Sequence, residues 1–167
     1  MIRPLAKHDV TAWARMRAQL WPDADAAELA REAAAFLAAP HETALIDAVF
    51  VADQLGEIVG FLELAVRAFS DGCESMPVPH VEGWFVSVSE RARGVGRALI
   101  AAAADWARER GFTELASDTE VSNERSQHAH AACGFEEVDR LVKYRMRLTD
   151  SPSTSRVLRG STDRPAS

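Results

Sequence analysis

The chain has 167 residues, of which 47% are hydrophobic and 26% charged, and its formal net charge at pH 7 is −6. This composition predicts one soluble domain with a continuous core, and no apolar run reaches the roughly 20 residues of a membrane-spanning helix. The last seventeen residues carry a net charge of +2, which leaves −8 for residues 1–150 and disfavours nucleic acid as a partner.

The two cysteines, Cys73 and Cys133, form no Cys-x-x-Cys motif. This usage predicts neither a disulfide framework nor a zinc site. The N-terminus shows no apolar leader, because Arg3 and Pro4 follow Met1 almost at once. We therefore expect a cytoplasmic protein without a bound metal.

Apolar side chains recur at nearly helical spacing over residues 8–21, which predicts a first helix with Asp9 as its cap. The turn-like sequence Trp-Pro-Asp follows the last apolar residue of this helix. We therefore expect Trp21 to lie on an exposed connection rather than in the apolar stripe.

An alanine-rich second helix is predicted over residues 25–39. Asp25 and Glu28 have the spacing of a capping box at its start, and Pro40 ends it. Two helices therefore precede the first strand-like run.

Two β-rich runs, residues 43–53 and 57–69, are joined by the tight turn Asp-Gln-Leu-Gly, which predicts an antiparallel hairpin. Side chains of a strand point alternately to opposite faces of the sheet. Alternation in the second run places Ile58, Leu62, Leu64 and Val66 on one face and Phe61, Glu63 and Arg67 on the other.

A glycine and two prolines break the chain over residues 70–79. After a strand over residues 80–88, a long helix with an apolar stripe is predicted over residues 95–111, with Gly111 as its C-terminal cap. Alternation in the strand places Glu82, Trp84, Val86 and Val88 on one side.

A short strand over residues 112–119 and a capped helix over residues 123–134 follow, and residues 135–148 are predicted to finish in strands. The order of the elements, with a parallel crossover around the long helix, predicts an α/β (α+β) domain in which helices cover a mixed sheet. The alternating residues of the last strands are Val142, Tyr144, Met146 and Leu148.

The chain is polar and rich in Pro and Ser from Thr149 onward. Such a segment cannot bury enough apolar surface to order itself. We therefore expect one domain over residues 1–149 and a disordered tail over residues 150–167.

The stretch "ERARGVGRAL", residues 90–99, places Gly94 and Gly96 among three arginines, between a strand and a helix. A strand that feeds a glycine turn and then a helix presents free main-chain N–H groups and a positive helix end. Arginine adds fork-shaped, charge-assisted hydrogen bonds. The turn therefore predicts a site for a phosphate or pyrophosphate.

Two common phosphate motifs fit this turn poorly. A Walker-type loop requires Lys and then Ser or Thr after its last glycine, but Arg97 follows Gly96. A dinucleotide fingerprint would use Asp118, about 20 residues on, yet Leu99 occupies the place of its third glycine. The chain is also too short for a second nucleotide-binding half, so a dinucleotide site is the weaker alternative.

The hexapeptide "RARGVG" resembles the R/Q-x-x-G-x-G/A signature of the GNAT superfamily of N-acetyltransferases. About thirty residues later, "NERSQHAHAACGF" resembles a second family motif with Asn123, Gly134 and Phe135 in register, while Ser126 replaces an alanine and His130 a tyrosine. The stretches "QLWPD", "FLELAVRAF", "VEGWFVSVSERARGVG" and "ELASDTEVSN" resemble the aminoglycoside 6′-N-acetyltransferases within that superfamily. The resemblance covers most of residues 1–148.

The resemblance implies a mostly antiparallel central sheet flanked by about four helices, and acetyl-coenzyme A as the co-substrate. It assigns the backbone of Phe85, Val86 and Ser87 to the acetyl and pantetheine portion, and Asn123 to the pantetheine arm. The residues assigned to the pyrophosphate are Arg91, Ala92, Arg93, Gly94, Val95, Gly96 and Arg97.

Acetyl transfer to an amine requires a neutral amine and a protonated leaving thiolate. By position alone, Glu82 suits a solvated strand-edge glutamate and Asp118 a loop-starting or capping aspartate. The resemblance instead implies that both carboxylates hold and deprotonate the amine. It assigns the antibiotic to Trp21, Glu82, Asp118 and Asp139, with Glu63, Arg67, Asp71 and Glu137 as further candidates for the wall of the site.

His130 occupies the place of the family tyrosine that protonates the sulfur of coenzyme A, and a histidine suits that role. A hydrogen-bonded surface histidine explains the residue nearly as well. His128 and His130 diverge on a helix, so their spacing does not predict a metal site.

The sequence therefore predicts an acetyl-coenzyme A-dependent aminoglycoside 6′-N-acetyltransferase. Two alternatives stay open: an acetyltransferase for a polyamine, an amino acid or a protein N-terminus, and a non-catalytic regulator that binds coenzyme A or a nucleotide. The resemblance also implies a homodimer, in which the last strands pair across a twofold axis.

Overall fold

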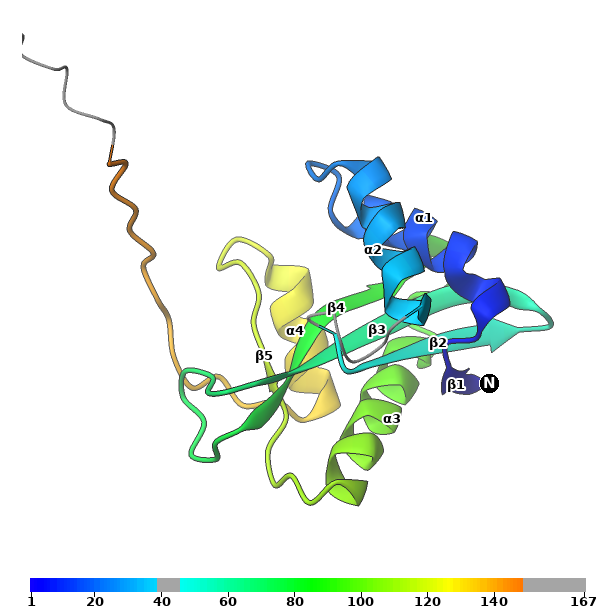
Figure 1. Cartoon of the computed structure of the whole chain (residues 1–167). Helices are drawn as coiled ribbons and strands as arrows, with labels where there is room; N and C mark the ends of the chain where they lie inside the picture. Colours follow the sequence, from blue (N-terminus) through cyan, green and yellow to red (C-terminus); the bar gives the residue numbers. More distant parts are fainter. Residues whose placement is uncertain (39–45, 149–167) are drawn as a thin grey trace, which may run out of the picture.

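Residues 1–38 and 46–148 are described by the structure, which is a computed structural model of the chain. Within these ranges the strands form one mixed sheet in the order β1-β2-β3-β4-β5, antiparallel except for the parallel pair β4 and β5 (Figure 1). The strands are β1 (Ile2–Pro4), β2 (Ala48–Gln54), β3 (Glu57–Arg67), β4 (Val78–Val86) and β5 (Ala116–Ser117). The α-helices are α1 (Val10–Leu20), α2 (Ala26–Ala38), α3 (Val95–Glu109) and α4 (Glu124–Cys133), and two short 3-10 helices span Lys7–Asp9 and Val88–Glu90.

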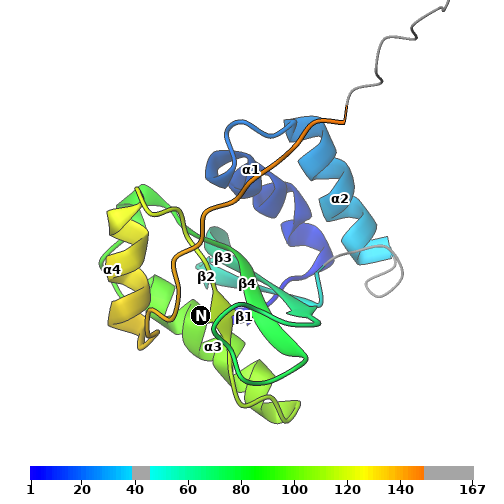
Figure 2. The same cartoon turned by 90° about the vertical axis from the view of Figure 1, so that its left-hand side faces the viewer.

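Helices cover both faces of this sheet, as the order of the elements predicts (Figures 1 and 2). On one face Trp13 of α1 and Phe36 of α2 pack against Phe61 and Phe85. On the other face α3 buries its apolar stripe against β2, β3 and β4, through residues that include Leu99. Helix α4 lies beside α3 next to β5. The mixed, mostly antiparallel sheet confirms the predicted fold class, and no helix of the described ranges is long and apolar enough to cross a membrane.

The two N-terminal helices form where the sequence predicts them. Of their predicted N-terminal caps, Asp25 caps its helix and Asp9 does not. The Asp25 carboxylate accepts a hydrogen bond from the Ala27 N–H at 2.9 Å and caps α2. The Asp9 carboxylate instead accepts from Arg3, at 2.6 and 3.0 Å, and from the Ala6 N–H at 2.8 Å. Asp9 therefore ties β1 to the start of α1 rather than capping the helix. The predicted stop at Pro40 lies outside the described residues.

A β-bulge overturns the predicted position of one residue of the hairpin. Ala52 pairs with Gly60 and Asp53 with Ile58, so Val59 is an extra residue in β3. An extra residue reverses the alternation of side chains beyond it. Ile58 consequently packs on the α1 face with Phe61, and Val59 takes its predicted place on the α3 face.

A second bulge lies in β4, where Glu63 pairs with Gly83 and Leu64 with Val81. Glu82 is the extra residue, so Val81 and Trp84 pack against the same core cluster although they are three residues apart. The predicted alternation holds for Trp84 and Val86. It is wrong for Val88, which lies beyond the end of β4 in the 3-10 helix Val88–Glu90 and is exposed.

The predicted terminal strands are absent from the described part of the chain. Residues 135–148 follow α4 as an extended segment without strand pairing. A strand needs a partner for its main-chain groups, and none lies beside this segment within the described ranges. Its alternating apolar side chains are therefore exposed, Tyr144 at 91% and Leu148 at 89%. The predicted tail, residues 150–167, lies outside the described residues, as do residues 43–45 of the predicted hairpin.

Candidate active site

The glycine turn leads directly into α3 and leaves its N-terminal amides free. Gly94 has φ +84°, a left-handed conformation that favours glycine, and Ala92 has φ +60°. The first main-chain hydrogen bond of the helix joins the Ala98 N–H to the Gly94 oxygen at 3.0 Å. The preceding N–H groups lack intrahelical partners and point outward at the positive helix end. This geometry suits an anion, and the turn is therefore the candidate anion site.

The two glycines of the turn have different roles. A Cβ on Gly94 would meet no atom within 4 Å, so open space surrounds the left-handed residue. A Cβ on Gly96 would lie 2.9 Å from the indole ring of Trp84, which real contacts do not allow without a shift. Gly96 is therefore required for close packing of α3 on β4, whereas Gly94 is required for the turn.

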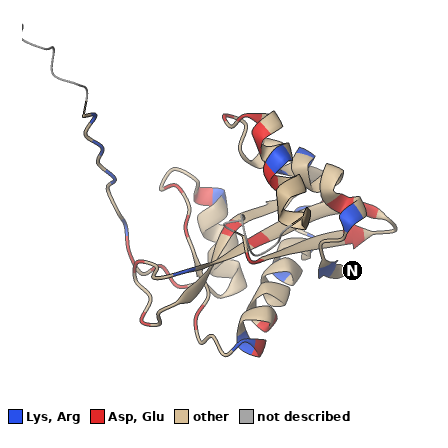
Figure 3. Ribbon diagram, in the orientation of Figure 1, with Lys and Arg blue, Asp and Glu red and all other residues tan. Residues whose placement is uncertain are grey.

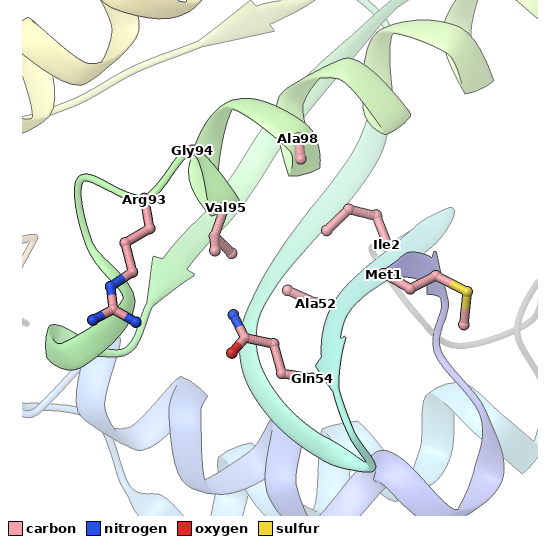
Figure 4. Close-up of a pocket in the computed structure, with 8 residues that line it drawn as sticks. All are labelled: Met1, Ile2, Ala52, Gln54, Arg93, Gly94, Val95 and Ala98. Carbon is pink, nitrogen blue, oxygen red and sulfur yellow. The ribbon is translucent and has the colours of Figure 1, made fainter.

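The three arginine side chains of the turn point in different directions. Nε of Arg91 donates to the Val86 oxygen at 2.9 Å, and a terminal nitrogen of Arg97 donates to the Ala132 oxygen at 2.8 Å. Arg93 is exposed, 3.4 Å from Glu90, and lies beside the small pocket that the turn forms with β1 and β2 (Figure 4). The free anion-binding groups that the turn brings together are therefore its main-chain amides rather than three guanidinium groups.

Strands β4 and β5 part immediately before the bulge. They pair only at His80 with Ala116 and at Val81 with Ser117. From Gly83 to Val86, β4 therefore has no strand on its β5 side within the described residues. Phe85 turns its ring into the core, while the Ser87 N–H donates to the Val59 oxygen at 2.8 Å. An edge of main-chain groups is thus open to a ligand near the anion site.

A cleft of about 1750 Å³ lies on the far side of this opening. It collects residues from α1, β3, β4, β5, α4 and the segment after α4. The predicted site residues that line it are Trp21, Glu63, Arg67, Asp71, Glu82, Asp118, His130, Glu137 and Asp139. The residues predicted to bind acetyl-coenzyme A do not line this cleft. Among them Asn123 caps α4, where its Oδ1 accepts from the Ser126 N–H at 3.1 Å.

Acidic groups outnumber basic ones in this cleft. Ten of its lining residues are Asp or Glu and four are Lys or Arg. Acidic positions recur along the connection from β5 to α4 and in the first part of the segment after α4 (Figure 3). Such a surface attracts cationic molecules.

The two predicted catalytic carboxylates are held by two residues of the same sheet. Arg67 grips Glu82 with two hydrogen bonds of 2.7 Å and lies 3.9 Å from Asp118. The Glu82 hydrogen bond raises the pKa of the Arg67 guanidinium. Beneath Asp118, Nε2 of buried His80 is 3.3 Å from Oδ2, a close contact without hydrogen-bond geometry.

His80 itself was not singled out by the sequence. Its Nδ1 lies 3.1 Å from the Ser70 hydroxyl, and burial, followed by the positive charge of Arg67, lowers the pKa of its ring. A neutral ring therefore underlies Asp118. The strand pairing with Ala116, the first residue of β5, brings His80 to this place.

Glu63 and Arg17 form a buried ion pair at the wall of the cleft. Glu63, 1% exposed, accepts from the Trp13 indole at 2.8 Å and lies 2.9 Å from Nε of Arg17. Arg17 also reaches Glu32 of α2 at 3.0 Å. Burial outweighs the attraction of Arg17 and raises the pKa of Glu63 to about 7. Arg17 was missed because it reads as one more polar residue of an amphipathic helix.

Trp21 is half-buried, which corrects the predicted exposed connection. The Arg17 guanidinium lies 5.2 Å from the Trp21 ring centroid. A Cβ on Gly83 would lie 2.9 Å from the edge of the same ring. The absent side chain at Gly83 therefore lets the indole rest on β4 next to Glu82, and Trp21 becomes a wall of the cleft.

His130 is enclosed between two elements. Its Nδ1 is 2.7 Å from the Ser126 main-chain oxygen, and its Nε2 is 2.8 Å from the Ser117 hydroxyl. Trp84, which packs on Gly96 of the turn, meets the His130 ring edge to face at 5.3 Å. The indole thus links the anion site to the cleft.

Comparison with known proteins agrees with this geometry. Residues 10–135 match the model of the acetyltransferase (GNAT) family. Curated relatives include aminoglycoside N(6′)-acetyltransferase type 1 of Klebsiella aerogenes, 42% identical over 148 residues, with 89% of this chain and 97% of the relative covered. The same enzyme of Stenotrophomonas maltophilia is 44% identical over 158 residues, with 90% and 95% covered.

Similar solved structures include aminoglycoside N-acetyltransferase AAC(6′)-Iy in complex with the bisubstrate analogue CoA-S-monomethyl-acetylneamine. It has a TM-score of 0.79 and 38% sequence identity, and the match covers 88% of this chain and 97% of that one. AAC(6′)-Iy in complex with CoA matches with the same TM-score at 37% identity, with 88% and 94% covered. The match to the family model spans most of the fold, from α1 to the end of α4, and the chain belongs to the GNAT acetyltransferase family.

Proposed function

We propose that the chain is an aminoglycoside 6′-N-acetyltransferase, which transfers the acetyl group of acetyl-coenzyme A to the 6′-amine of an aminoglycoside antibiotic and so confers resistance. One observation carries the proposal. The anion-binding end of α3 and the acid-rich cleft meet at the place where β4 and β5 part, on either side of Trp84. The reaction belongs to the cytoplasm, the compartment that holds acetyl-coenzyme A.

The donor side fits acetyl-coenzyme A through its main chain. The free amides at residues 94–97 suit the pyrophosphate, and the open space at Gly94 lets phosphate oxygens approach them. The unpaired edge of β4 at Trp84, Phe85 and Val86 suits the amides of the pantetheine arm, which can add to a strand edge. Arg91 holds the Val86 oxygen and so fixes the end of that edge.

The acceptor side fits a polyamine sugar through its carboxylates. Glu82 and Asp118 attract the ammonium group and take its proton, directly or through one water molecule, so that the neutral amine attacks the thioester carbon. Arg67 at present occupies both oxygens of Glu82. An arriving ammonium group replaces Arg67 as the counter-charge of this carboxylate, and the ring of Trp21 supplies a flat wall for a sugar.

Purified full-length chain, acetyl-coenzyme A and a panel of amines test the proposal. We expect thiol release with kanamycin or tobramycin, and product mass spectra that place the acetyl group on the 6′-nitrogen. Turnover only with a polyamine, an amino acid or a peptide N-terminus would reject the substrate and retain an acetyltransferase. Binding of acetyl-coenzyme A without turnover of any amine would favour a regulator.

A homodimer is part of the proposal. The exposed alternating residues of segment 135–148 lack a strand partner within the described chain, and a second copy related by a twofold axis supplies one. Light scattering after gel filtration is expected to give twice the mass of the 18.2 kDa chain. Tyr144→Asp with Leu148→Asp is expected to give the monomer, and a wild-type monomer contradicts this part.

A further inference from the structure

Ser117 and His130 form a side-chain contact that the transfer as described does not use. Ser117 is the last residue of β5 and pairs with Val81, one residue before the bulge at Glu82. Its Oγ is 2.8 Å from Nε2 of His130 on α4. Both residues line the cleft, so the pair stands where the two strands part.

The hydrogen bonds of His130 determine which ring nitrogen carries the proton. Nδ1 is 2.7 Å from the Ser126 carbonyl oxygen, which only accepts hydrogen bonds. Nδ1 therefore carries a hydrogen, and Nε2 of the neutral ring accepts from the Ser117 hydroxyl. In the protonated ring, Nε2–H donates to Ser117 Oγ instead, which frees the hydroxyl hydrogen to point into the cleft.

Both ring nitrogens of His130 already have hydrogen-bond partners among the described residues. Trp84 and Phe135 lie against its ring at centroid distances of 5.3 and 5.2 Å. Ser126 and Ser117 occupy its two nitrogens. A proton that leaves Nε2 therefore passes through the hydroxyl of Ser117.

We propose that Ser117 is the catalytic acid of the acetyl transfer and that His130 supplies its proton. The assignment rests on the proposed function and deepens it. As the carbon–sulfur bond breaks, its electron pair remains on sulfur, the Ser117 hydroxyl proton moves to that sulfur, and the Nε2 proton moves to the Ser117 oxygen. The step leaves a thiol, an intact serine and a neutral imidazole, which takes up a proton from solvent before the next turnover.

Thiol release by the full-length chain tests the role of Ser117. Ser117→Ala is expected to lower kcat about 100-fold while the KM for acetyl-coenzyme A changes less than about twofold, because the acid acts only in the transition state. Ser117→Thr keeps the hydroxyl and is expected to retain most of kcat. Ser122→Ala makes the same change at an exposed serine just before α4 and is the matched control. Wild-type kcat in Ser117→Ala would overturn the assignment.

A double variant tests whether the two residues act in series. His130→Gln is expected to lose about as much kcat as Ser117→Ala, and the combination is expected to be no slower than either alone, within about threefold. Losses that multiply would show two independent roles and overturn the relay.

His130→Tyr provides a second background, in case Ser117→Ala folds poorly. A phenol at position 130 carries its own hydroxyl, so replacing Ser117 by Ala in that background is expected to change kcat less than about threefold. A loss there as large as in the wild type would mean that Ser117 supports the fold rather than transferring a proton. Single-turnover rates measured in mixtures of light and heavy water report how many protons move in the step. We expect two protons for the wild type and one for Ser117→Ala in the His130→Tyr background.

Different results would reject the proposed function and the assignment of Ser117. A wild type that acetylates no aminoglycoside rejects the proposed function before any variant is made. An active wild type with an equally active Ser117→Ala rejects only the acid.

Discussion

The two sides of the proposed site are built in different ways. The donor side is a contiguous stretch, residues 84–98, in which the open edge of β4, the free amides of the turn and two glycines define the geometry. The acceptor side is a cleft whose charged side chains come from α1, α2, β3, β4, the connection after β5 and the segment after α4. A main-chain site tolerates changes of side chain but not of backbone conformation. A side-chain site has the opposite sensitivity, and this difference can be measured.

The largest expected effect comes from neutralising the carboxylates of the acceptor side, which leaves the donor side unchanged. Glu82→Gln together with Asp118→Asn removes the groups that hold and deprotonate the amine, and we expect kcat/KM for the amine to fall about 10³-fold, or ~4 kcal/mol. The KM for acetyl-coenzyme A is expected to stay within about twofold. Glu57→Gln, an exposed acid at the start of β3, is the matched control. An equal loss of donor affinity would mean that the two sides are not independent.

An intermediate effect is expected in stability, because a buried acid lies under the acceptor cleft. The folded chain raises the pKa of Glu63 from 4.5 to about 7, so between these values it holds a proton that the unfolded chain has lost. Stability therefore falls as pH rises from about 4.5 to 7, by up to about 3 kcal/mol from this group, and is level above 7.

Denaturant unfolding of the wild type and Glu63→Gln between pH 5 and 8 tests this slope. The amide cannot titrate, so the difference between the two curves isolates the contribution of Glu63. We expect the loss of stability in Glu63→Gln, relative to the wild type, to be smallest near pH 8. A difference that does not vary with pH would show that Arg17 keeps Glu63 ionised throughout.

The smallest expected effect comes from the backbone of the donor side. Gly94→Val places a β-branched residue at φ +84° and is expected to cost about 2 kcal/mol of stability and to raise the KM for acetyl-coenzyme A about tenfold. Gly111→Val makes the same change at φ +81°, just beyond the other end of α3, where a Cβ also meets nothing within 4 Å. It is expected to lose similar stability without a change in KM. Equal KM values for the two variants would show that this turn does not bind acetyl-coenzyme A.

The parts of the site that the sequence predicts are those with local causes. A left-handed glycine, a helix start and a C-terminal glycine act within a few residues, so α3 and α4 form where the pattern places them. The bulge at Val59 could not be predicted, because it depends on the register between two strands. The same holds for the bulge in β4, because the sequence predicts Glu82 as a site residue without indicating that it is the extra residue of the strand.

The remaining errors also have long-range causes. Whether residues 135–148 form strands depends on a partner that the described chain does not supply. Arg17, His80 and Ser117 escape notice because their roles arise from contacts with Glu63, Asp118 and His130, on other elements. A signal for one of them was present: Trp13 and Arg17 lie four residues apart, one turn of a helix, so a single acid could bind both.

The bulge at Glu82 has a consequence for how this strand can change its length. Without that residue Val81 would join Gly83 directly, and the indole that meets α3 and the phenyl ring that meets Phe61 would keep their sides of the sheet in a regular ladder. The fold therefore accommodates the extra residue without depending on it. Deletion of Glu82 is expected to keep the fold and abolish only catalysis, whereas deletion of a second residue from β4 would invert its alternation and is expected to abolish folding.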